Sequence, residues 1–583
     1  MLKKFLFIFS VVAVILSSCN KDTEKQLRLN IIVTTDIHGS LYSYDFIEEE
    51  DISGSLSSLT GFIAEIEEQN GNDIILLDNG DILQGDPSVY YHNYIDTSGE
   101  HLVSRMLNYI GYDAATVGNH DVEPGHEVYD KIQKEYEFPW LAANVIDKRT
   151  DRPYFTPYTV IEKNQVKVAV LGLVTPTIPR WLPEQVYSGM KFKDMLTTAE
   201  KWVKTIKEKE DADVIVGLFH SGLGELDSKK NSENAVLSVA HEVDGLDIIF
   251  YGHDHHEYNN KITNNSGEEV LLLNPGANAN KAAMATINVM KKNSGVQISG
   301  ITGSFIELKN YSPTQDFEEK FNLSRQEIQQ YVNKELTWLP ESLSTRNAFF
   351  GPSRWMQLIH ETQLTYTGAD ISFSAPLSMD EHIIKGSLTV GELFKLYRFR
   401  NLLYTIELTG KEIKDYLEYS YSSWFNTIQN TDDHLLKFKL DSTGDPEYSE
   451  NYGHHLLAGT SYNFDSGYGI DYTVDLTQQP GKRIDIHSFS NGKPFHLNQK
   501  YSVALNSYRA NGGGGHLTDG VGLTPQEIDE RIKNVQPHDV RYLIRKEVKK
   551  NDTLNISLNR NWKVEPFQVW NKTKSIDSLL IFN

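Results

Sequence analysis

The sequence predicts an α/β fold built in layers, and three observations support this. Short apolar runs typical of buried strands alternate with segments whose apolar residues recur at helical spacing. Alternation of this order indicates sheets with helices packed on their faces. Polar residues that could ligate a metal follow directly after several of the runs. The expected strands are 27–33, 73–77, 114–117, 168–174, 214–219 and 248–251.

Length and charge set limits on the whole chain. Its 583 residues exceed what one hydrophobic core usually supports, so two domains are expected. The net charge of -23 is unfavourable for a broad basic face, so a nucleic-acid polymer is not an expected partner. An anionic substrate must therefore be recognised locally.

The amino terminus has the pattern of an export signal. Two lysines precede an apolar stretch from Phe5 to Leu16, which is followed by Ser17-Ser18-Cys19. Leu16 to Cys19 resembles a bacterial lipobox, which implies removal of a signal peptide at 1–18 and acylation of Cys19. The alternative is an ordinary secretory signal beside a stray cysteine. We expect an exported lipoprotein, periplasmic or at the cell surface, attached to a membrane through the lipid and a polar tether at 19–26.

The first two strands each lead to candidate ligands. Asp36 and His38 follow the first strand, two residues apart, so both side chains can turn toward one cation. A helix with Leu59, Phe62, Ile63 and Ile66 on one face comes next, and Asp81 follows the second strand.

The tetrapeptide Gly118-Asn119-His120-Asp121 follows the third strand and is expected in the loop at its carboxyl end. The glycine would allow a sharp turn, the Asn119 oxygen could bind a cation, and His120 could donate a proton to a departing oxygen. Taken alone, the segment could equally be a loop cap with a surface histidine.

Two later strands add the remaining candidates. His220 follows the strand at 214–219, and His253 and His255 follow the strand at 248–251. Each has an ordinary explanation, as a core or surface histidine. Ligands of open α/β sheets, however, bind outside the carboxyl ends of the strands, so five loops together predict one site.

This order of motifs (Asp-x-His-Gly, Gly-Asp, Gly-Asn-His-Asp, His220, Gly-His-x-His) resembles the calcineurin-like metallophosphoesterases between Ile31 and about Met290. The resemblance implies a layered α/β/β/α metallophosphoesterase domain at 27–310 with two divalent metal ions. It implies that one metal is held by Asp36, His38, Asp81 and His255, and the other by Asp81, Asn119, His220 and His253. His120 would be catalytic, paired with either Glu123 or Asp121. The ligand types suit zinc, manganese, iron or cobalt.

The second half predicts a linking helix at 311–340, a domain at 341–550 and a carboxyl-terminal extension at 551–583. Segments from about Gly351 to Asp519 resemble the mixed α+β nucleotide-binding domain of bacterial 5′-nucleotidases and 2′,3′-cyclic-nucleotide phosphodiesterases. By that resemblance Phe399 and Tyr508 would hold the base, and Asn401 would belong to the same substrate site. Core packing is the alternative for both rings.

Two departures from the 5′-nucleotidase pattern bear on the substrate. Phe373-Ser374-Ala375-Pro376-Leu377 replaces a glycine- and arginine-bearing segment, and Gly514 stands where an aspartate is usual. Loss of groups that would grip a terminal phosphate and a free ribose favours a cyclic phosphate. Both changes resemble the 2′,3′-cyclic-nucleotide 2′-phosphodiesterase and 3′-nucleotidase branch, and this resemblance implies that activity for the chain. The alternatives are a 5′-nucleotidase and a lipoprotein that binds nucleotide or metal without turnover.

Overall fold

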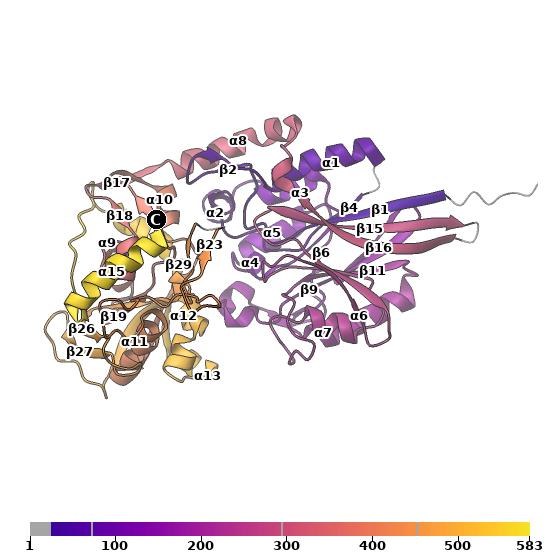
Figure 1. Ribbon diagram of the computed structural model, residues 1–583. Helices are drawn as coiled ribbons and strands as arrows, with labels where there is room; N and C mark the ends of the chain where they lie inside the picture. Colours follow the sequence, from indigo (N-terminus) through magenta and orange to yellow (C-terminus); the bar gives the residue numbers. More distant parts are fainter. Residues whose placement is uncertain (1–24, 71–73, 293–294, 451–452, 583) are drawn as a thin grey trace, which may run out of the picture.

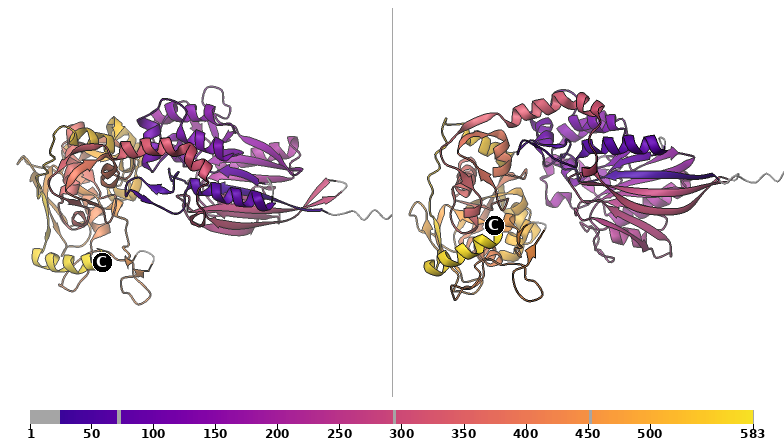
Figure 2. Two further views of the ribbon diagram at one scale, coloured as in Figure 1. Left: turned by 90° about the horizontal axis from the view of Figure 1, so that it is seen from above. Right: turned by 45° about the horizontal axis from the view of Figure 1, so that its top comes forward.

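The computed structural model describes residues 25–70, 74–292, 295–450 and 453–582. The predicted signal peptide and Cys19 lie outside these residues. Two bodies are visible, an amino-terminal one coloured indigo to magenta and a carboxyl-terminal one coloured orange to yellow (Figures 1 and 2). Strand β1 begins at Lys25, so the fold takes in the last two residues of the predicted tether.

The amino-terminal domain contains two six-stranded sheets. In the first sheet, β1, β4, β5 and β6 are parallel, β15 pairs antiparallel with β1, and β16 pairs antiparallel with β15. In the second sheet, the four inner strands are parallel. In spatial order, the first sheet consists of β16 (Gly295–Glu307), β15 (Lys281–Lys292), β1 (Lys25–Thr34), β4 (Ile74–Asp78), β5 (Ala114–Thr116) and β6 (Trp140–Leu141). The second consists of β13 (Tyr258–Thr263), β14 (Glu269–Asn274), β12 (Ile248–Tyr251), β11 (Val214–His220), β9 (Val166–Val174) and β8 (Tyr158–Lys163).

The two sheets pack face to face around a common core. Alternate residues of β1, including Leu29 and Ile31, meet alternate residues of β11, including Val214 and Val216, and all are almost fully buried. Each such side chain contributes roughly 1.5–3 kcal/mol by leaving water. Helices cover both outer faces, which confirms the predicted α/β/β/α layering. They are α1 (Leu56–Asn70), α2 (Pro87–Tyr94), α3 (Leu102–Ile110) and α5 (His126–Glu135) on the first sheet, and α6 (Met195–Lys209) and α7 (Val236–Glu242) on the second.

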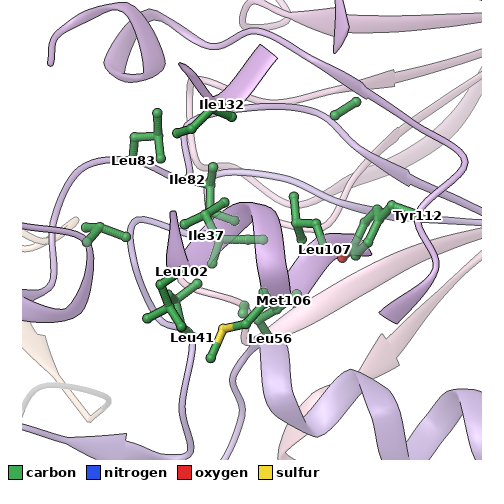
Figure 3. Close-up of a cluster of buried hydrophobic side chains, with 14 of the residues drawn as sticks. Ile37, Leu41, Leu56, Ile82, Leu83, Leu102, Met106, Leu107, Tyr112 and Ile132 are labelled. Carbon is green, nitrogen blue, oxygen red and sulfur yellow. The ribbon is translucent and has the colours of Figure 1, made fainter. Parts of the chain in front are cut away.

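Apolar residues inside the polar loops anchor those loops to the core. Ile37 lies between Asp36 and His38, and Ile82 directly follows Asp81; both are buried. Their side chains lie in one cluster with Leu102 of α3 (Figure 3). The neighbouring polar side chains are therefore held at fixed positions.

Helix α8 (Gln315–Val332) extends from the amino-terminal body toward the second one (Figures 1 and 2). It is shorter than the predicted helix at 311–340, because 335–339 alternates in burial and forms β17 (Glu335–Leu339), which pairs with β21 (Gly386–Thr389). Phe317, Phe321, Ile328 and Val332 of α8 are buried in the amino-terminal core.

The carboxyl-terminal domain has the expected mixed α+β architecture around a five-stranded sheet. In spatial order the sheet consists of β25 (Ser466–Tyr468), β19 (Ile371–Ser374), β28 (Lys500–Asn506), β22 (Leu402–Thr409) and β29 (Ile532–Asp539). The main helices around it are α9 (Arg354–Thr367), α10 (Val390–Leu396), α11 (Gly410–Trp424) and α14 (Val540–Val548). None of the helices in the described residues is long and apolar enough to cross a membrane.

Residues 551–582, the described part of the segment predicted as an extension at 551–583, belong to this domain. Strand β30 (Trp562–Glu565) pairs in parallel with β26 (Ile470–Asp475), and α15 (Phe567–Phe582) follows. Asp577 of α15 is fully buried and accepts hydrogen bonds from the Leu436 backbone N–H and from His434. The loop that contains His434 and Leu436 and helix α15 thus stabilise each other.

Candidate active site

Five loops meet at the carboxyl ends of strands from both sheets. They follow β1, β4 and β5 of the first sheet and β11 and β12 of the second. Six of the seven predicted metal ligands form two compact triads, whose ligand atoms lie within 4.8 Å of one another: Asp36, His38 and His255 in one, and Asp81, His220 and His253 in the other.

In the first triad, Nε2 of His255 lies 3.3 Å from Oδ1 of Asp36 and 3.0 Å from Nε2 of His38. The other ring nitrogen of His38 lies 3.2 Å from two oxygens of Gln84, its carbonyl and its side-chain amide. Both oxygens accept hydrogen bonds, so Nδ1 carries the proton and Nε2 faces the triad unprotonated. Burial lowers the pKa of His38 to about 4, which keeps the ring neutral.

In the second triad, Nε2 of His220 lies 3.1 Å from Oδ2 of Asp81 and 3.9 Å from Oδ1 of Asp36, so the two triads are adjacent. The Nδ1–H of His220 donates to the carbonyl of Asn79 at 2.7 Å and fixes the ring. Both His220 and Asp81 are buried.

The residues present fit divalent cations. Asn119 Oδ1 is buried without a hydrogen-bond partner, although buried polar atoms normally have one. Two imidazole Nε2 atoms face each other at 3.0 Å in the first triad. A cation between such groups would satisfy them, and a set of imidazole, carboxylate and amide ligands suits zinc, manganese, iron or cobalt.

The backbone of these loops is strained. Five of the seven predicted ligands are non-glycine residues with positive φ, a conformation that costs on the order of 1–3 kcal/mol per residue and is concentrated at functional sites. They are Asp36 (49°), His38 (49°), Asp81 (59°), His253 (74°) and His255 (57°).

Glycines allow the two aspartates to approach the neighbouring backbone closely. A Cβ on Gly118 would lie 2.1 Å from Oδ1 of Asp81, and a Cβ on Gly252 would lie 2.3 Å from Oδ2 of Asp36. Gly118 itself has φ of −95°, an ordinary conformation. The expectation that Gly118 serves a sharp turn is therefore wrong, and its missing side chain is what the site requires.

The tetrapeptide begins a one-turn helix, α4 (Asn119–Val122), instead of lying in an open loop. Nδ1 of His120 lies 2.6 Å from Oε2 of Glu123, so of the two predicted carboxylate partners the structure pairs Glu123 with His120. Asp121 has a different position. Its carboxylate accepts hydrogen bonds from the backbone N–H groups of Gly118, Asp81, Ile82 and Leu83 at 2.8–3.1 Å.

Electrostatics favours a protonated His120. Burial alone would lower its pKa, but the Asp81 carboxylate and the Glu123 hydrogen bond outweigh burial and raise the pKa to about 9. Burial would raise the pKa of Asp81, yet the charges of His220 and His120 hold it well below its usual value. The arrangement can therefore bind cations through ionised carboxylates and deliver a proton from His120.

A cavity of about 520 Å³ extends from the predicted metal ligands to the second domain. Asn119 and His120 line one end, and the three predicted substrate-binding residues, Phe399, Tyr508 and Asn401, line the other.

Sequence reasoning missed two aromatic residues of this cavity. The ring of Tyr462 stands edge-on to both Phe399 and Tyr508, with centroid distances of 6.2 and 6.4 Å. Trp181 lies 5.5 Å from the ring of His253, and its carbonyl accepts a hydrogen bond from Asn511 of the second domain. Neither follows a strand or belongs to a recognisable motif, so no sequence signal marked them.

At Gly514, where 5′-nucleotidases usually have an aspartate, Arg509 and Asn463 occupy the space that a side chain would need. A Cβ at this glycine would lie 2.4 Å from Nη1 of Arg509 and 2.4 Å from Oδ1 of Asn463, and φ of 72° is unfavourable for other residues. The backbone here therefore has no room for an acidic side chain.

Comparison with known proteins matches both halves of the chain. Residues 29–257 match the calcineurin-like phosphoesterase family, and residues 331–519 match the family described as 5′-nucleotidase, C-terminal domain. A trifunctional nucleotide phosphoesterase of Bacillus subtilis is 26% identical over 94% of this chain, which spans only 40% of that protein.

A 2′,3′-cyclic-nucleotide 2′-phosphodiesterase/3′-nucleotidase of Haemophilus influenzae is 24% identical over 93% of this chain and 88% of its own length. Among solved structures, a 5′-nucleotidase precursor of Thermus thermophilus superposes with a TM-score of 0.60 at 21% identity, over 92% of this chain and 99% of the other. At that identity the superposition shows a shared fold.

Proposed function

We propose that this chain, a calcineurin-like phosphoesterase with a 5′-nucleotidase C-terminal domain, opens 2′,3′-cyclic nucleotides to 3′-nucleotides and then removes the 3′-phosphate. Its family makes it a metal-dependent phosphoester hydrolase. The observation that carries the nucleotide proposal is the single cavity that holds Asn119 and His120 at one end and Phe399, Tyr462 and Tyr508 at the other.

Asp36, His38 and His255 would hold one cation, and Asp81, Asn119, His220 and His253 the other, with Asp81 shared between them. When bound, such a pair of cations supplies an activated water and neutralises charge on the phosphoryl group. The strained loops would set these ligands in advance, which would avoid reorganisation during the reaction.

His120 would protonate the leaving oxygen of the ribose. Glu123 occupies Nδ1 of the ring, which leaves Nε2 as the atom that can face a substrate. Asp121 takes no direct part in this proposal, because its carboxylate is engaged with four backbone N–H groups.

The base would lie among the aromatic rings of the second domain, with Asn401 nearby. Aromatic faces stack on any base with little preference between them. Two features support a cyclic phosphate: Gly514 excludes an acidic side chain near the nucleoside, and the Haemophilus relative, matched over most of its length, is named for this activity.

A comparison of phosphoester hydrolysis on three substrates tests the proposal. We expect 2′,3′-cyclic AMP and 3′-AMP to react with a kcat/KM at least tenfold above that of 5′-AMP, a difference of about 1.4 kcal/mol in transition-state binding. A preference for 5′-AMP would make the chain a 5′-nucleotidase instead. No hydrolysis of any nucleotide, with metals bound, would indicate a binding protein without turnover.

We further propose export and lipid attachment at Cys19. The support is the sequence alone, through the basic residues, the apolar stretch and the single cysteine. When cells are grown with a labelled fatty acid, the chain with its natural Cys19 should become labelled, whereas the Cys19→Ala variant should stay unlabelled. Equal labelling of the two would contradict acylation at this position.

A further inference from the structure

We propose that Arg400, from the second domain, is a positioning residue that holds Glu123 and through it the orientation of His120. His120 and Glu123 both belong to the first domain. The proton donor would then be complete only where the two domains meet. This inference rests on the proposed function in one respect, that His120 protonates a leaving alkoxide.

Arg400 contacts Glu123 at two points. Its Nη1 donates to the main-chain carbonyl of Glu123 at 3.1 Å and lies 3.5 Å from the carboxylate Oε1. The other carboxylate oxygen, Oε2, lies 2.6 Å from Nδ1 of His120. Oε2 is therefore hydrogen-bonded to the histidine, whereas Oε1, which is buried and has no hydrogen-bond partner, lies at ion-pair distance from the arginine.

Both charged groups are shielded from water. The side chain of Glu123 is 6% exposed and that of Arg400 is 15% exposed. A buried carboxylate is stable only with a partner charge and hydrogen bonds, and loss of one partner leaves the charge uncompensated. Without Arg400, the Glu123 carboxylate would keep only His120 as a partner and could change its rotamer. The His120 ring would then no longer be held in one orientation.

Arg400 is itself held from both domains. Its guanidinium lies over the ring of Tyr94 in α2, 4.4 Å from the ring centre, and its Nε lies 3.9 Å from Oδ2 of Asp539. Asp539 caps α14, and the next residue, Val540, donates its backbone N–H to the carbonyl of Asn401 at 2.8 Å. The segment with Phe399 and Asn401, which lines the base end of the cavity, is thus the same segment that supports the proton donor.

The experiment compares two leaving groups in the metal-loaded enzyme. Arg400→Met removes the charge and keeps a flexible apolar chain against Tyr94. Hydrolysis of 2′,3′-cyclic AMP expels an alkoxide that needs a proton, whereas bis(p-nitrophenyl) phosphate expels a phenolate that does not. We expect kcat for the nucleotide to fall about tenfold with KM changed by less than about threefold, and the p-nitrophenyl rate to change by less than about twofold.

A double-mutant cycle tests whether Arg400 acts through Glu123. Glu123→Gln alone should lower kcat for the nucleotide, and adding Arg400→Met should lower it no further, because the two changes remove one shared interaction. Arg400→Lys should recover part of the rate. The matched control is Lys395→Met, which breaks another ion pair between the domains, to Glu48 at 2.7 Å, and should leave both rates unchanged.

Three results would overturn the inference: equal losses on both substrates, a loss confined to KM, or full additivity of the two substitutions. The first two would indicate damaged domain packing or direct substrate binding. If Arg400→Met does not fold, the same comparison with Arg400→Lys decides. Failure of the proposed function is a separate result, namely an unmodified enzyme that hydrolyses p-nitrophenyl esters but no nucleotide.

Discussion

Three consecutive side chains of helix α4 have three different environments. Asn119 has a buried side-chain oxygen without a hydrogen-bond partner, which the proposed second cation would bind. His120 pairs with Glu123, and Asp121 accepts hydrogen bonds from four backbone N–H groups. Asp121 therefore holds the loop of Asp81 in place, while Glu123 orients the ring of His120, the proposed proton donor.

This division predicts different consequences for two similar substitutions. Asp121→Asn should lose metal and destabilise the first domain by about 2–3 kcal/mol, because an amide replaces a charged acceptor of several hydrogen bonds. Glu123→Gln should keep metal content and stability but lower kcat about 10- to 100-fold. Metal analysis, urea unfolding and nucleotide hydrolysis of both variants check this. Loss of metal from Glu123→Gln, with none from Asp121→Asn, would reverse the assignment.

Metal binding should release protons. Burial would lower the pKa of His220, but Asp81 and Asp36 raise it from 6.5 to about 10 in the metal-free protein. The proton on His220 stabilises the metal-free fold below pH 6.5, and this stabilisation is lost as the pH rises through about 10. At pH 8 a cation must displace that proton, so affinity should rise with pH.

Calorimetric titration of manganese into the metal-free protein at pH 8 checks this linkage. The measured heat should depend on the ionisation enthalpy of the buffer, with roughly one proton or more released per protein. A heat that is the same in HEPES and in Tris, two buffers with different ionisation enthalpies, would show that His220 carries no proton to lose.

At the scale of elements, the site depends on how closely β-strand loops pack. Gly118→Ala places a Cβ 2.1 Å from Oδ1 of Asp81, although its φ of −95° would accept any residue. We therefore expect this variant to lose metal and at least about 100-fold of its activity. Gly300→Ala in β16 is the control, since a Cβ there meets nothing within 4 Å, and it should match the unmodified chain in metal content and rate.

Helix α15 should stabilise the second domain through one buried carboxylate. Asp577→Ala leaves the Leu436 N–H and His434 without their acceptor and should cost about 1–3 kcal/mol in the free energy of unfolding. Asp432→Ala removes an exposed ion pair, 3.5 Å long, between the same loop and the same helix. It should cost less than about 1 kcal/mol, and equal effects of the two in urea unfolding would contradict the account.

At the scale of the molecule, the sequence was most informative where function depends on strand ends. Asp36, Asp81 and His253 could be located because each follows an apolar run, and parallel strands bring such positions to one edge. The role of Gly118 was misjudged, since close packing against Asp81 involves residues far apart in the chain. The same reason hid Tyr462, which belongs to no periodic segment.

Contacts between domains were the least predictable part. The pairing of Arg400 with Glu123 joins residues 277 positions apart, and nothing in either segment specifies the other. The packing of residues 551–582 into the second domain was also missed, because α15 and β30 become stable only through neighbours such as β26. Local patterns predict elements, whereas these contacts arise from tertiary packing.

The most direct test of the central claim is the location of metal in crystals of the protein grown with manganese, by anomalous scattering. The account predicts two peaks roughly 3.5–4 Å apart, one at Asp36, His38 and His255 and the other at Asn119, His220 and His253, with Asp81 coordinating both. A single peak, or two peaks with Asp81 bound to neither, would contradict it.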